Sequence, residues 1–423
     1  MSASFISSAG PDALKGRKVL IIVENLPLPF DRRVWLEART LKAAGAEVSI
    51  ICPTGKGHEA AEEDIDGIHI YRHDLPPESE GAIGYLREYL SALVAETRLA
   101  WKIFFKHGFD VIHGCNPPDL IFLVALPFKL FGKKFVFDHH DINPELYEAK
   151  FNRRDMFWRL LRLVERLTFK TADVSIATNE SYRAIAVERG GMDPEKVFVV
   201  RSGPDIEKLK PAADDPELKR GRRFMVGYVG VMGEQEGIDL LLESVRHIVH
   251  DLGRRDIQFT LAGSGPALES LQALSHALKV EDHVAFLGRV PDAELFALLS
   301  TADLCVNPDR VNTMNDLSTM NKIMEYMAFS KPIVQFDVKE GRYSAQHSSL
   351  YARKNDPRDF AERILDLLGD EKLRQEMGEF GRRRVVRELC WRNQIPTLLN
   401  AYLSALGNGR EMAALNAEPN RQA

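Results

Sequence analysis

Short apolar runs of strand length recur along the chain and alternate with stretches in which apolar residues return at helical spacing. Near-continuous apolar strands that alternate with helices are typical of a parallel sheet covered on both faces. The strands we predict are 18–23, 47–52, 68–72, 110–114, 134–138, 173–178 and 196–200, followed by a second series at 224–230, 257–263, 283–288, 302–308 and 331–336. The pattern therefore predicts two doubly wound α/β domains in tandem.

Amphipathic stretches between these strands supply the helices. We predict them at 33–44, 84–107, 117–131, 155–171 and 179–189 in the first series, and at 237–251, 266–278, 291–300, 319–329 and 357–368 in the second. Gly, Pro and charged residues interrupt the alternation between the series, which indicates a linker. The organisation we predict is a flexible N-terminus (1–16), a first domain (17–205), a linker (206–222), a second domain (223–390), a C-terminal helix (391–406) and a disordered tail (407–423).

The length of 423 residues suits two such domains better than one core. A net charge of −5 disfavours a nucleic-acid-binding surface. The four cysteines, Cys52, Cys115, Cys305 and Cys390, are too widely spaced for a zinc module and suggest reduced thiols. The first residues lack the order of a signal peptide, and no apolar run approaches the roughly 20 residues of a membrane span. We expect a cytoplasmic protein of enzyme size.

The start of the helix at 319–329 carries polar residues of the kind that cap helices, which predicts a start near 318–320. Its first amide groups and the helix dipole form an anion site, to which Lys322 adds a positive charge. Glu325 lies one turn further on the same face, where a carboxylate can accept hydrogen bonds from two sugar hydroxyls. This pattern predicts a nucleoside diphosphate site, and the alternative is a capped helix with a surface Lys–Glu pair. The site residues are Ser318, Thr319, Met320, Asn321, Lys322 and Glu325.

The segment "DHHDINPE" (138–145) follows an apolar strand, where ligands bind in parallel sheets. His140 and Asp141 are the ligand-binding candidates in this segment. Adjacent residues of an extended segment point to opposite faces, which disfavours a metal site. Glu145 is either an acceptor-side carboxylate or a charge at a helix N-terminus. Asp64-x-Asp66 is a pair of carboxylates that resembles a metal-binding motif, but it lies in an acidic loop and not after a buried strand. We therefore predict no essential metal.

The segment "PFDRRV" (29–34) follows the first strand and leads into a helix. Asp31, Arg32 and Arg33 therefore lie where a donor phosphate or an acceptor would bind. The alternative is a capped helix start with surface charge.

Several motifs follow one another in an order that resembles the glycosyltransferase family 4 nucleotide-sugar transferases, and among them the subgroup that builds bacterial O-antigen and exopolysaccharide repeats. They are "PLPFDRRVWLEARTLKAAGAEVSIICP" (27–53), "DHHDINPELYEAKF" (138–151), "VRSGPD" (200–205), "YVGVMGEQEGID" (228–239), "LAGSGP" (261–266), "FLGRVPDAEL" (286–295), "ADLCVNP" (302–308) and "NKIMEYMAFSKPIV" (321–334). The resemblance extends from about residue 17 to about residue 405.

The resemblance implies a GT-B fold, in which two Rossmann-like domains face each other across a cleft. The N-terminal domain would bind the acceptor, the C-terminal domain would bind the donor, and helix 391–406 would pack back on the N-terminal domain. It also implies transfer of a sugar from a nucleoside-diphosphate sugar, with a UDP-sugar favoured, to an acceptor hydroxyl with retention of configuration. Glu325 would hold the donor ribose, and His140 would reach the transferred sugar. No cofactor is implied.

One departure concerns the donor phosphates, because the family usually carries an Arg and a Lys where this chain has Val231 and Glu236. Lys322, the helix amides and an arginine would then have to supply more of the positive charge. "LAGSGP" is not a dinucleotide fingerprint, since its third glycine position is Leu268, so we exclude NAD. Glycines at these loops either approach the nucleotide or only turn the chain. The further donor-site candidates are Gly230, Gly233, Gly263, Gly265 and Arg289.

The segment 149–173 is basic and amphipathic, and such a helix either lies on an anionic membrane or covers a sheet. The partners we predict are a nucleotide-sugar donor and a saccharide acceptor, which is often polyprenyl-linked in the resembling subgroup. Peripheral contact with the inner membrane face fits such an acceptor. Two other functions remain open, namely a nucleotide-sugar epimerase of the same fold and a non-catalytic binding partner that lacks the two usual cations.

Overall fold

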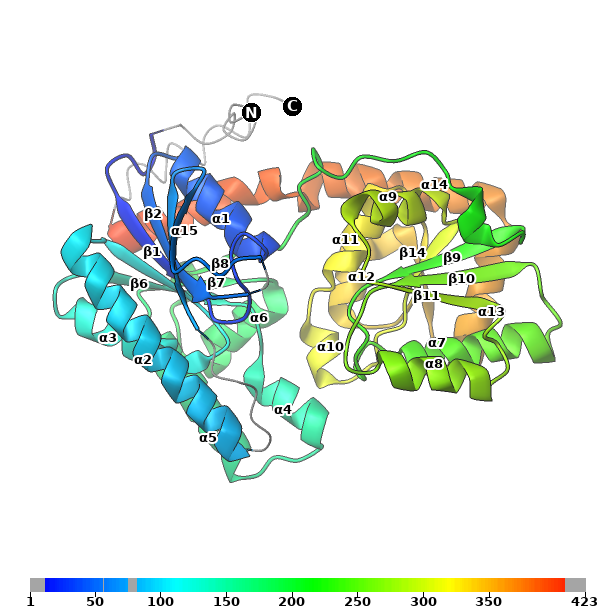
Figure 1. Cartoon of the computed structure of the whole chain (residues 1–423), viewed down its shortest axis with the longest axis horizontal. Helices are drawn as coiled ribbons and strands as arrows, with labels where there is room; N and C mark the ends of the chain where they lie inside the picture. Colours follow the sequence, from blue (N-terminus) through cyan, green and yellow to red (C-terminus); the bar gives the residue numbers. More distant parts are fainter. Residues whose placement is uncertain (1–11, 56, 75–81, 408–423) are drawn as a thin grey trace. The chain divides into compact units, whose positions relative to one another are not determined.

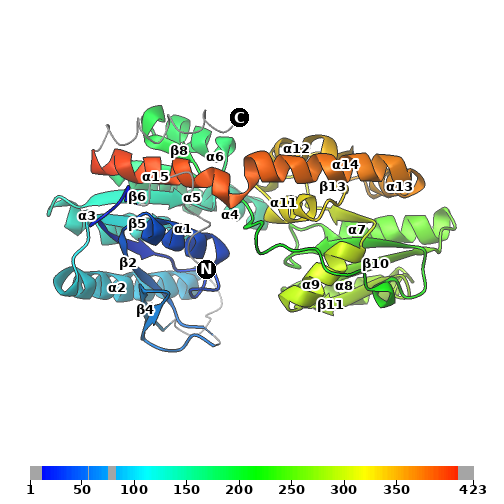
Figure 2. The same cartoon turned by 90° about the horizontal axis from the view of Figure 1, so that it is seen from above.

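The computed structural model describes residues 12–55, 57–74 and 82–407, so most of the predicted flexible N-terminus and of the predicted disordered tail lies outside the described residues. The chain divides into two compact units (Figures 1 and 2). The first comprises Met1–Ser202 and Gln394–Ala423, and the second comprises Gly203–Asn393. Within the predicted flexible N-terminus, residues 12–16 form a turn in which Leu14 is buried.

An eight-stranded sheet in the order β3-β4-β2-β1-β5-β6-β7-β8 forms the centre of the first unit. Every neighbouring pair is parallel except β3 and β4, which are antiparallel. The apolar runs become buried strands because helices cover both faces. The strands are β1 (Lys18–Ile22), β2 (Glu47–Pro53), β3 (Glu62–Ile65), β4 (Ile68–His73), β5 (Val111–Cys115), β6 (Lys134–His139), β7 (Val174–Ala177) and β8 (Val197–Val199).

Successive side chains of each strand point to opposite faces of the sheet, and helices of this unit pack on both faces. Phe137 of β6 packs against Phe169 of α5, with ring centroids 5.1 Å apart, whereas the next residue, Asp138, points to the opposite face toward α1. On that second face His113 of β5 contacts Tyr402 of α15. The α-helices are α1 (Arg32–Ala43), α2 (Ala82–Lys106), α3 (Phe122–Lys129), α4 (Asn143–Phe151), α5 (Met156–Thr171), α6 (Glu180–Ala184) and α15 (Trp391–Leu406).

The second unit contains a six-stranded parallel sheet in the order β11-β10-β9-β12-β13-β14. Its strands are β9 (Phe224–Val229), β10 (Ile257–Ala262), β11 (Val284–Gly288), β12 (Leu304–Asn307), β13 (Ile333–Phe336) and β14 (Ser349–Ala352). Two buried apolar clusters pack this sheet against its helices. The helices are α7 (Ile238–Arg246), α8 (Leu268–Ala277), α9 (Asp292–Thr301), α10 (Thr313–Leu317), α11 (Asn321–Ala328), α12 (Lys339–Ala345), α13 (Pro357–Gly369) and α14 (Glu371–Arg384).

The predicted pair of doubly wound α/β domains is confirmed, with differences at the edges. Strand β3 occupies the acidic segment for which a loop was predicted, and Oδ2 of Asp64 there lies 2.8 Å from Nδ1 of His69. Strand β14 was not predicted. The segment between the two strand series contains a short 3₁₀ helix at Pro216–Lys219, and Lys219 is ion-paired with Asp303 at the start of β12. Within the residues that the structure describes, no helix combines the length and the apolar composition that crossing a bilayer requires.

Candidate active-site groups

A buried arginine organises the polar residues at the carboxyl ends of β5 and β6. Arg33 lies in the first turn of α1, and its side chain is only 9% exposed. Its Nη2 lies 2.9 Å from Oδ1 of Asp138 and 3.1 Å from Oε1 of Glu37. Its Nη1 donates to the carbonyl of Val200 and to the hydroxyl of Ser202, at 2.9 and 3.0 Å. Arg33 therefore acts in the structure as an internal counter-charge, and the predicted contact with a phosphate or acceptor stays a prediction.

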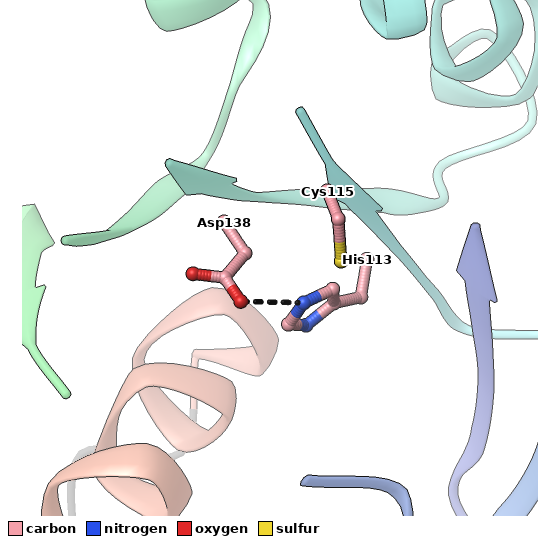
Figure 3. Close-up of side chains that lie close together, drawn as sticks. All are labelled: His113, Cys115 and Asp138. Atoms are coloured by element: carbon pink, nitrogen blue, oxygen red, sulfur yellow. Dashed lines mark ion pairs between the residues drawn. The ribbon is translucent and has the colours of Figure 1, made fainter. Parts of the chain in front are cut away.

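Asp138 connects this arginine to the two nearby histidines. Its Oδ2 lies 2.5 Å from Nε2 of His140. The same oxygen lies 3.3 Å from Nε2 of His113, and Figure 3 shows this second contact as a dashed line. Burial opposes ionisation of Asp138, but Arg33 and His140 hold its pKa well below the usual value. Burial and the charge of Asp138 raise the pKa of Glu37 well above its usual value. The network thus holds two buried carboxyl groups whose pKa values are shifted in opposite directions around one guanidinium.

Two groups of side chains in this network have ligand atoms within 4.8 Å of one another, as a metal site requires. The first is His113, Cys115 and Asp138 (Figure 3), and the second adds Glu37 and His140 around the same aspartate. Neither donor set suits a cation, because Arg33 already neutralises Asp138 and burial raises the pKa of the Cys115 thiol well above its usual value. The absence of an essential metal stays a prediction, and this charge distribution favours it.

The other residues of "DHHDINPE" have different environments. The ring of His139 lies on the α5 side of the sheet, with its centroid 5.1 Å from that of Phe169, and burial lowers its pKa to about 3. Glu145 forms a buried ion pair with Arg189, which engages Glu165 as well. Arg189 therefore neutralises the Glu145 carboxylate, and no ligand is needed to explain its burial. The backbone amides of His140 and Asp141 both donate to Oδ1 of Asn116, which fixes the path of the chain after β6.

Asp141, Asp31 and Arg32 complete the predicted residues of the first unit. Burial raises the pKa of the Asp141 carboxyl. Asp31 caps α1 by accepting a hydrogen bond of 3.0 Å from the amide of Val34, and Arg32 is exposed beside it. The cap is the structural alternative that the sequence left open for Asp31.

Helix α11 begins at Asn321, and its N-cap is Met320, which has no side-chain capping hydrogen bond. The prediction that Ser318 and its neighbours cap this helix is therefore wrong. A separate short helix, α10, precedes it, and the Ser318 hydroxyl donates to the carbonyl of Met314 in α10. Ser318, Thr319 and Met320 form the half-buried connection between the two helices. Their predicted role in donor binding rests on this position alone.

Lys322, in the first turn of α11, is bonded within the protein. Its Nζ lies 2.8 Å from Oδ1 of Asp309, which follows β12, and 5.0 Å from the ring centroid of Tyr228 in β9. Burial lowers the pKa of Lys322, but Asp309 outweighs burial and raises it. Glu325 lies one turn further along α11 and is half-buried. Sequence reasoning missed Asp309, although its position directly after a predicted strand was a usable signal.

Positions 231 and 236 differ strongly in their surroundings. Val231 is largely exposed, and its carbonyl accepts a hydrogen bond of 2.7 Å from the Tyr228 hydroxyl. Oε2 of Glu236 accepts a hydrogen bond of 3.1 Å from the amide of Gly233. Burial raises the pKa of Glu236, Lys322 opposes this effect and Asp309 reinforces it. The loop thus places a carboxyl group, and not a cation, within the electrostatic influence of Lys322.

The predicted glycines allow the loops after β9 and β10 to touch. A Cβ on Gly263 would lie 1.8 Å from the carbonyl oxygen of Gly230, and one on Gly265 would lie 2.4 Å from that of Met232. Both positions therefore need glycine for close approach of the two backbones. The amide of Gly263 also donates to the carbonyl of Gly288, which directly precedes the exposed Arg289. Contact of these residues with a nucleotide stays a prediction.

Two family models match the chain, "Glycosyltransferase Family 4" over residues 31–208 and "Glycosyl transferases group 1" over residues 223–370. D-inositol 3-phosphate glycosyltransferase of Corynebacterium urealyticum is 25% identical over 262 residues, which cover 57% of this chain and 59% of the relative. The chain thus spans about three fifths of the length of that relative.

Solved structures share the fold of the chain. Sucrose-phosphate synthase from Thermosynechococcus elongatus superposes with a TM-score of 0.74 at 19% identity, over 95% of this chain and 99% of that one. Alr3699/HepE from Anabaena gives a TM-score of 0.68 at 15% identity, over 92% and 99%. The fold is that of the GT-B glycosyltransferases. The chain belongs to the glycosyltransferases of family 4 and group 1, as the order of its motifs predicted.

Proposed function

We propose that the protein transfers a sugar from a nucleoside-diphosphate sugar, with a UDP-sugar favoured, to an acceptor hydroxyl. The observation that carries this proposal is the position of two residues on the first turns of α11. Lys322 is bonded to Asp309, which follows β12, and Glu325 lies half-buried one turn further along the helix. The carboxyl ends of parallel strands are the usual ligand edge of such sheets. The Anabaena protein was solved in complex with UDP and glucose, which supports a nucleotide-sugar donor here.

The donor diphosphate would lie against the start of α11 and Lys322. As the glycosidic bond breaks, the leaving diphosphate gains negative charge, and the helix amides and Lys322 stabilise that charge. Glu325 would accept hydrogen bonds from the ribose hydroxyls and so fix the position of the anomeric carbon. The ion pair with Asp309 holds the ammonium group of Lys322 in place, so the positive charge is oriented before the donor binds. We propose no cofactor and no essential metal.

His140 would contact the transferred sugar. Its Nε2 lies 2.5 Å from Oδ2 of Asp138 and 3.0 Å from Nε of Arg33, so this nitrogen is engaged within the protein. Nδ1 is then the ring nitrogen left for a ligand. Retention of the anomeric configuration is proposed from family resemblance alone.

For the acceptor, we propose a saccharide on a lipid carrier, in the assembly of a bacterial cell-surface polysaccharide of the O-antigen or exopolysaccharide type. This proposal comes from the order of the motifs and from the basic character of residues 149–173. Such an acceptor would keep a cytoplasmic enzyme in contact with the inner face of a membrane.

The test is a panel of UDP-, GDP- and other nucleotide sugars, with titration calorimetry for binding and release of the free nucleotide for turnover. We expect one nucleotide to bind and its sugar to be consumed only when an acceptor is present. Glu325→Ala should lose donor binding, while Glu294→Ala, which replaces an exposed glutamate of α9, should not. Binding without turnover under all acceptors would favour the non-catalytic alternative. Equal binding by both variants would refute the assignment of the ribose to Glu325.

A further inference from the structure

Helix α5 has an apolar stripe on the side that faces away from the sheet. Met156, Leu160, Leu163 and Leu167 are spaced by four, three and four residues, so they align along one side of the helix. Their exposed fractions lie between 39% and 77%. The opposite side of α5 is buried and carries Glu165, Thr168 and Phe169. Burial against the protein therefore does not explain the stripe.

Other apolar residues of the same basic segment face the protein. Trp158 and Leu161 are half-buried on the side of the helix that turns toward the protein. The positively charged Arg162 packs over the Trp158 ring, with its guanidinium carbon 5.0 Å from the ring centroid. The outward apolar residues are thus a separate set from those that hold α5 in place.

Helix α3 continues the apolar surface. It lies beside α5, and both helices pack against β6. Its outward side carries Leu123 and Leu126, followed by Leu130 and Phe131 just after the helix, with exposed fractions between 41% and 88%. Val124, Ala125 and Phe128 point to the core. Eight exposed apolar side chains on two adjacent helices exceed the scattered apolar residues of an ordinary protein surface.

Cations border this surface. Arg159, Arg166 and Lys170 lie along one flank of the α5 stripe and are exposed. Among the described residues, none of these three is ion-paired with an acidic side chain. The acids of the segment are engaged elsewhere, because Asp155 caps α5 and Asp173 is ion-paired with Lys129. Glu165 is buried beside Arg189.

We propose that the outward surface of α3 and α5 docks on an anionic lipid bilayer. The apolar stripe would enter the boundary between head groups and acyl chains, while the flanking cations attract the anionic head groups. Charge complementarity favours an anionic bilayer over a second copy of this surface, because two such surfaces facing each other would bring Arg159, Arg166 and Lys170 against like charges. The inference rests on the membrane contact proposed above and deepens it by naming the surface, whereas its test by vesicle binding does not require sugar transfer.

The experiment is vesicle flotation of the full chain with phosphatidylcholine vesicles that contain or lack phosphatidylglycerol. We expect binding to the anionic vesicles that weakens as salt rises. The triple variant Arg159→Gln, Arg166→Gln, Lys170→Gln should bind these vesicles roughly five-fold more weakly for each cation removed. The matched control is Arg353→Gln, Lys372→Gln, Arg383→Gln, which removes the same charge from exposed positions of the second unit.

A second pair of variants tests the apolar contribution. Leu126→Ser with Leu163→Ser should reduce flotation at high salt, where the cations contribute little, and Leu252→Ser in the second unit should not. Unchanged melting temperatures verify that the exposed substitutions leave the fold intact. Equal binding to neutral vesicles, or equal loss in the control variants, overturns the proposal. A dimer in solution that Leu163→Ser dissociates overturns it as well and identifies the surface as a contact between copies of this chain.

Discussion

The Nε2 atom of His140 lies 2.5 Å from Oδ2 of Asp138, whose second oxygen is held by Arg33. Nε of Arg33 lies 3.0 Å from the same Nε2, so Asp138 and Arg33 together fix the orientation of the imidazole. Arg33 also bonds to the backbone at Val200, close to the end of the first unit's continuous segment at Ser202. One buried arginine therefore links the histidine's orienting carboxylate to the chain that leaves the domain.

We expect Asp138→Asn to lower the turnover number by about 100-fold or more, because an amide can no longer fix the imidazole as the carboxylate does. Nucleoside diphosphate affinity should stay unchanged, since the proposed nucleotide ligands lie in the second unit. Because the substitution also leaves Arg33 without its main counter-charge, the melting temperature must be measured alongside.

A double-mutant cycle separates a positioning role from general damage. If Asp138 acts through His140, then Asp138→Asn should cost little more turnover in the background of His140→Ala. Losses that simply add would contradict the proposed role of Asp138.

Lys322→Ala should reduce turnover strongly and also destabilise the second unit by about 3 kcal/mol, because it leaves Asp309 buried and uncompensated. Asp309→Ala combined with Lys322→Ala should recover much of the stability but none of the activity. Chemical denaturation and nucleotide release measure the two effects. Activity in the double variant would show that the ammonium group is not needed for the diphosphate.

Glu236→Gln should tighten nucleoside diphosphate binding by roughly five-fold at pH 8, because it removes a negative charge near Lys322. The gain should shrink as the pH falls, since burial raises the pKa of Glu236 and the wild-type carboxyl then takes up a proton. Calorimetric titration with UDP at several pH values measures this dependence. The exposed Glu234→Gln serves as the control, and an equal gain in both variants would mean that Glu236 is not special.

The strands were predictable because a buried parallel strand must be apolar along its whole length, as in β1 and β6. Strand β3 escaped prediction because it is an exposed edge strand with the sequence Glu-Glu-Asp-Ile, whose pairing with β4 leaves no apolar pattern. Capping of α11 by Ser318 was wrong because α10 forms immediately before it and takes the hydroxyl as a partner.

The sequence predicted where the site residues lie along the chain, but not which residues they bond to. His140 and Lys322 stand at strand and helix ends, which sequence patterns locate well. Their partners, Asp138 and Asp309, are chosen by the three-dimensional approach of loops, and no local pattern encodes that Arg33 meets a carboxylate 105 residues away. A cation near a sequence-predicted anion site can therefore turn out to be already bonded within the protein.

His139 provides a test of the buried face of the first unit. Its ring lies among the aromatic rings of Phe137, Phe169 and Tyr182, and burial lowers its pKa to about 3. An unfolded histidine titrates near pH 6.5, so below that pH protons bind the unfolded chain preferentially. The contribution of this histidine to stability therefore declines as the pH falls from about 6.5 toward 3.

We expect His139→Phe to remove this decline. Between pH 7 and pH 4 the unfolding free energy of the wild type should fall by roughly 2 to 3 kcal/mol more than that of the variant. Phenylalanine keeps the ring packing and cannot bind a proton. Denaturant unfolding at several pH values measures the difference. His276→Gln, at an exposed position of α8, should follow the wild-type curve. The same pH dependence in wild type and in His139→Phe would show that the imidazole of His139 accepts its proton in the folded state as easily as in the unfolded chain.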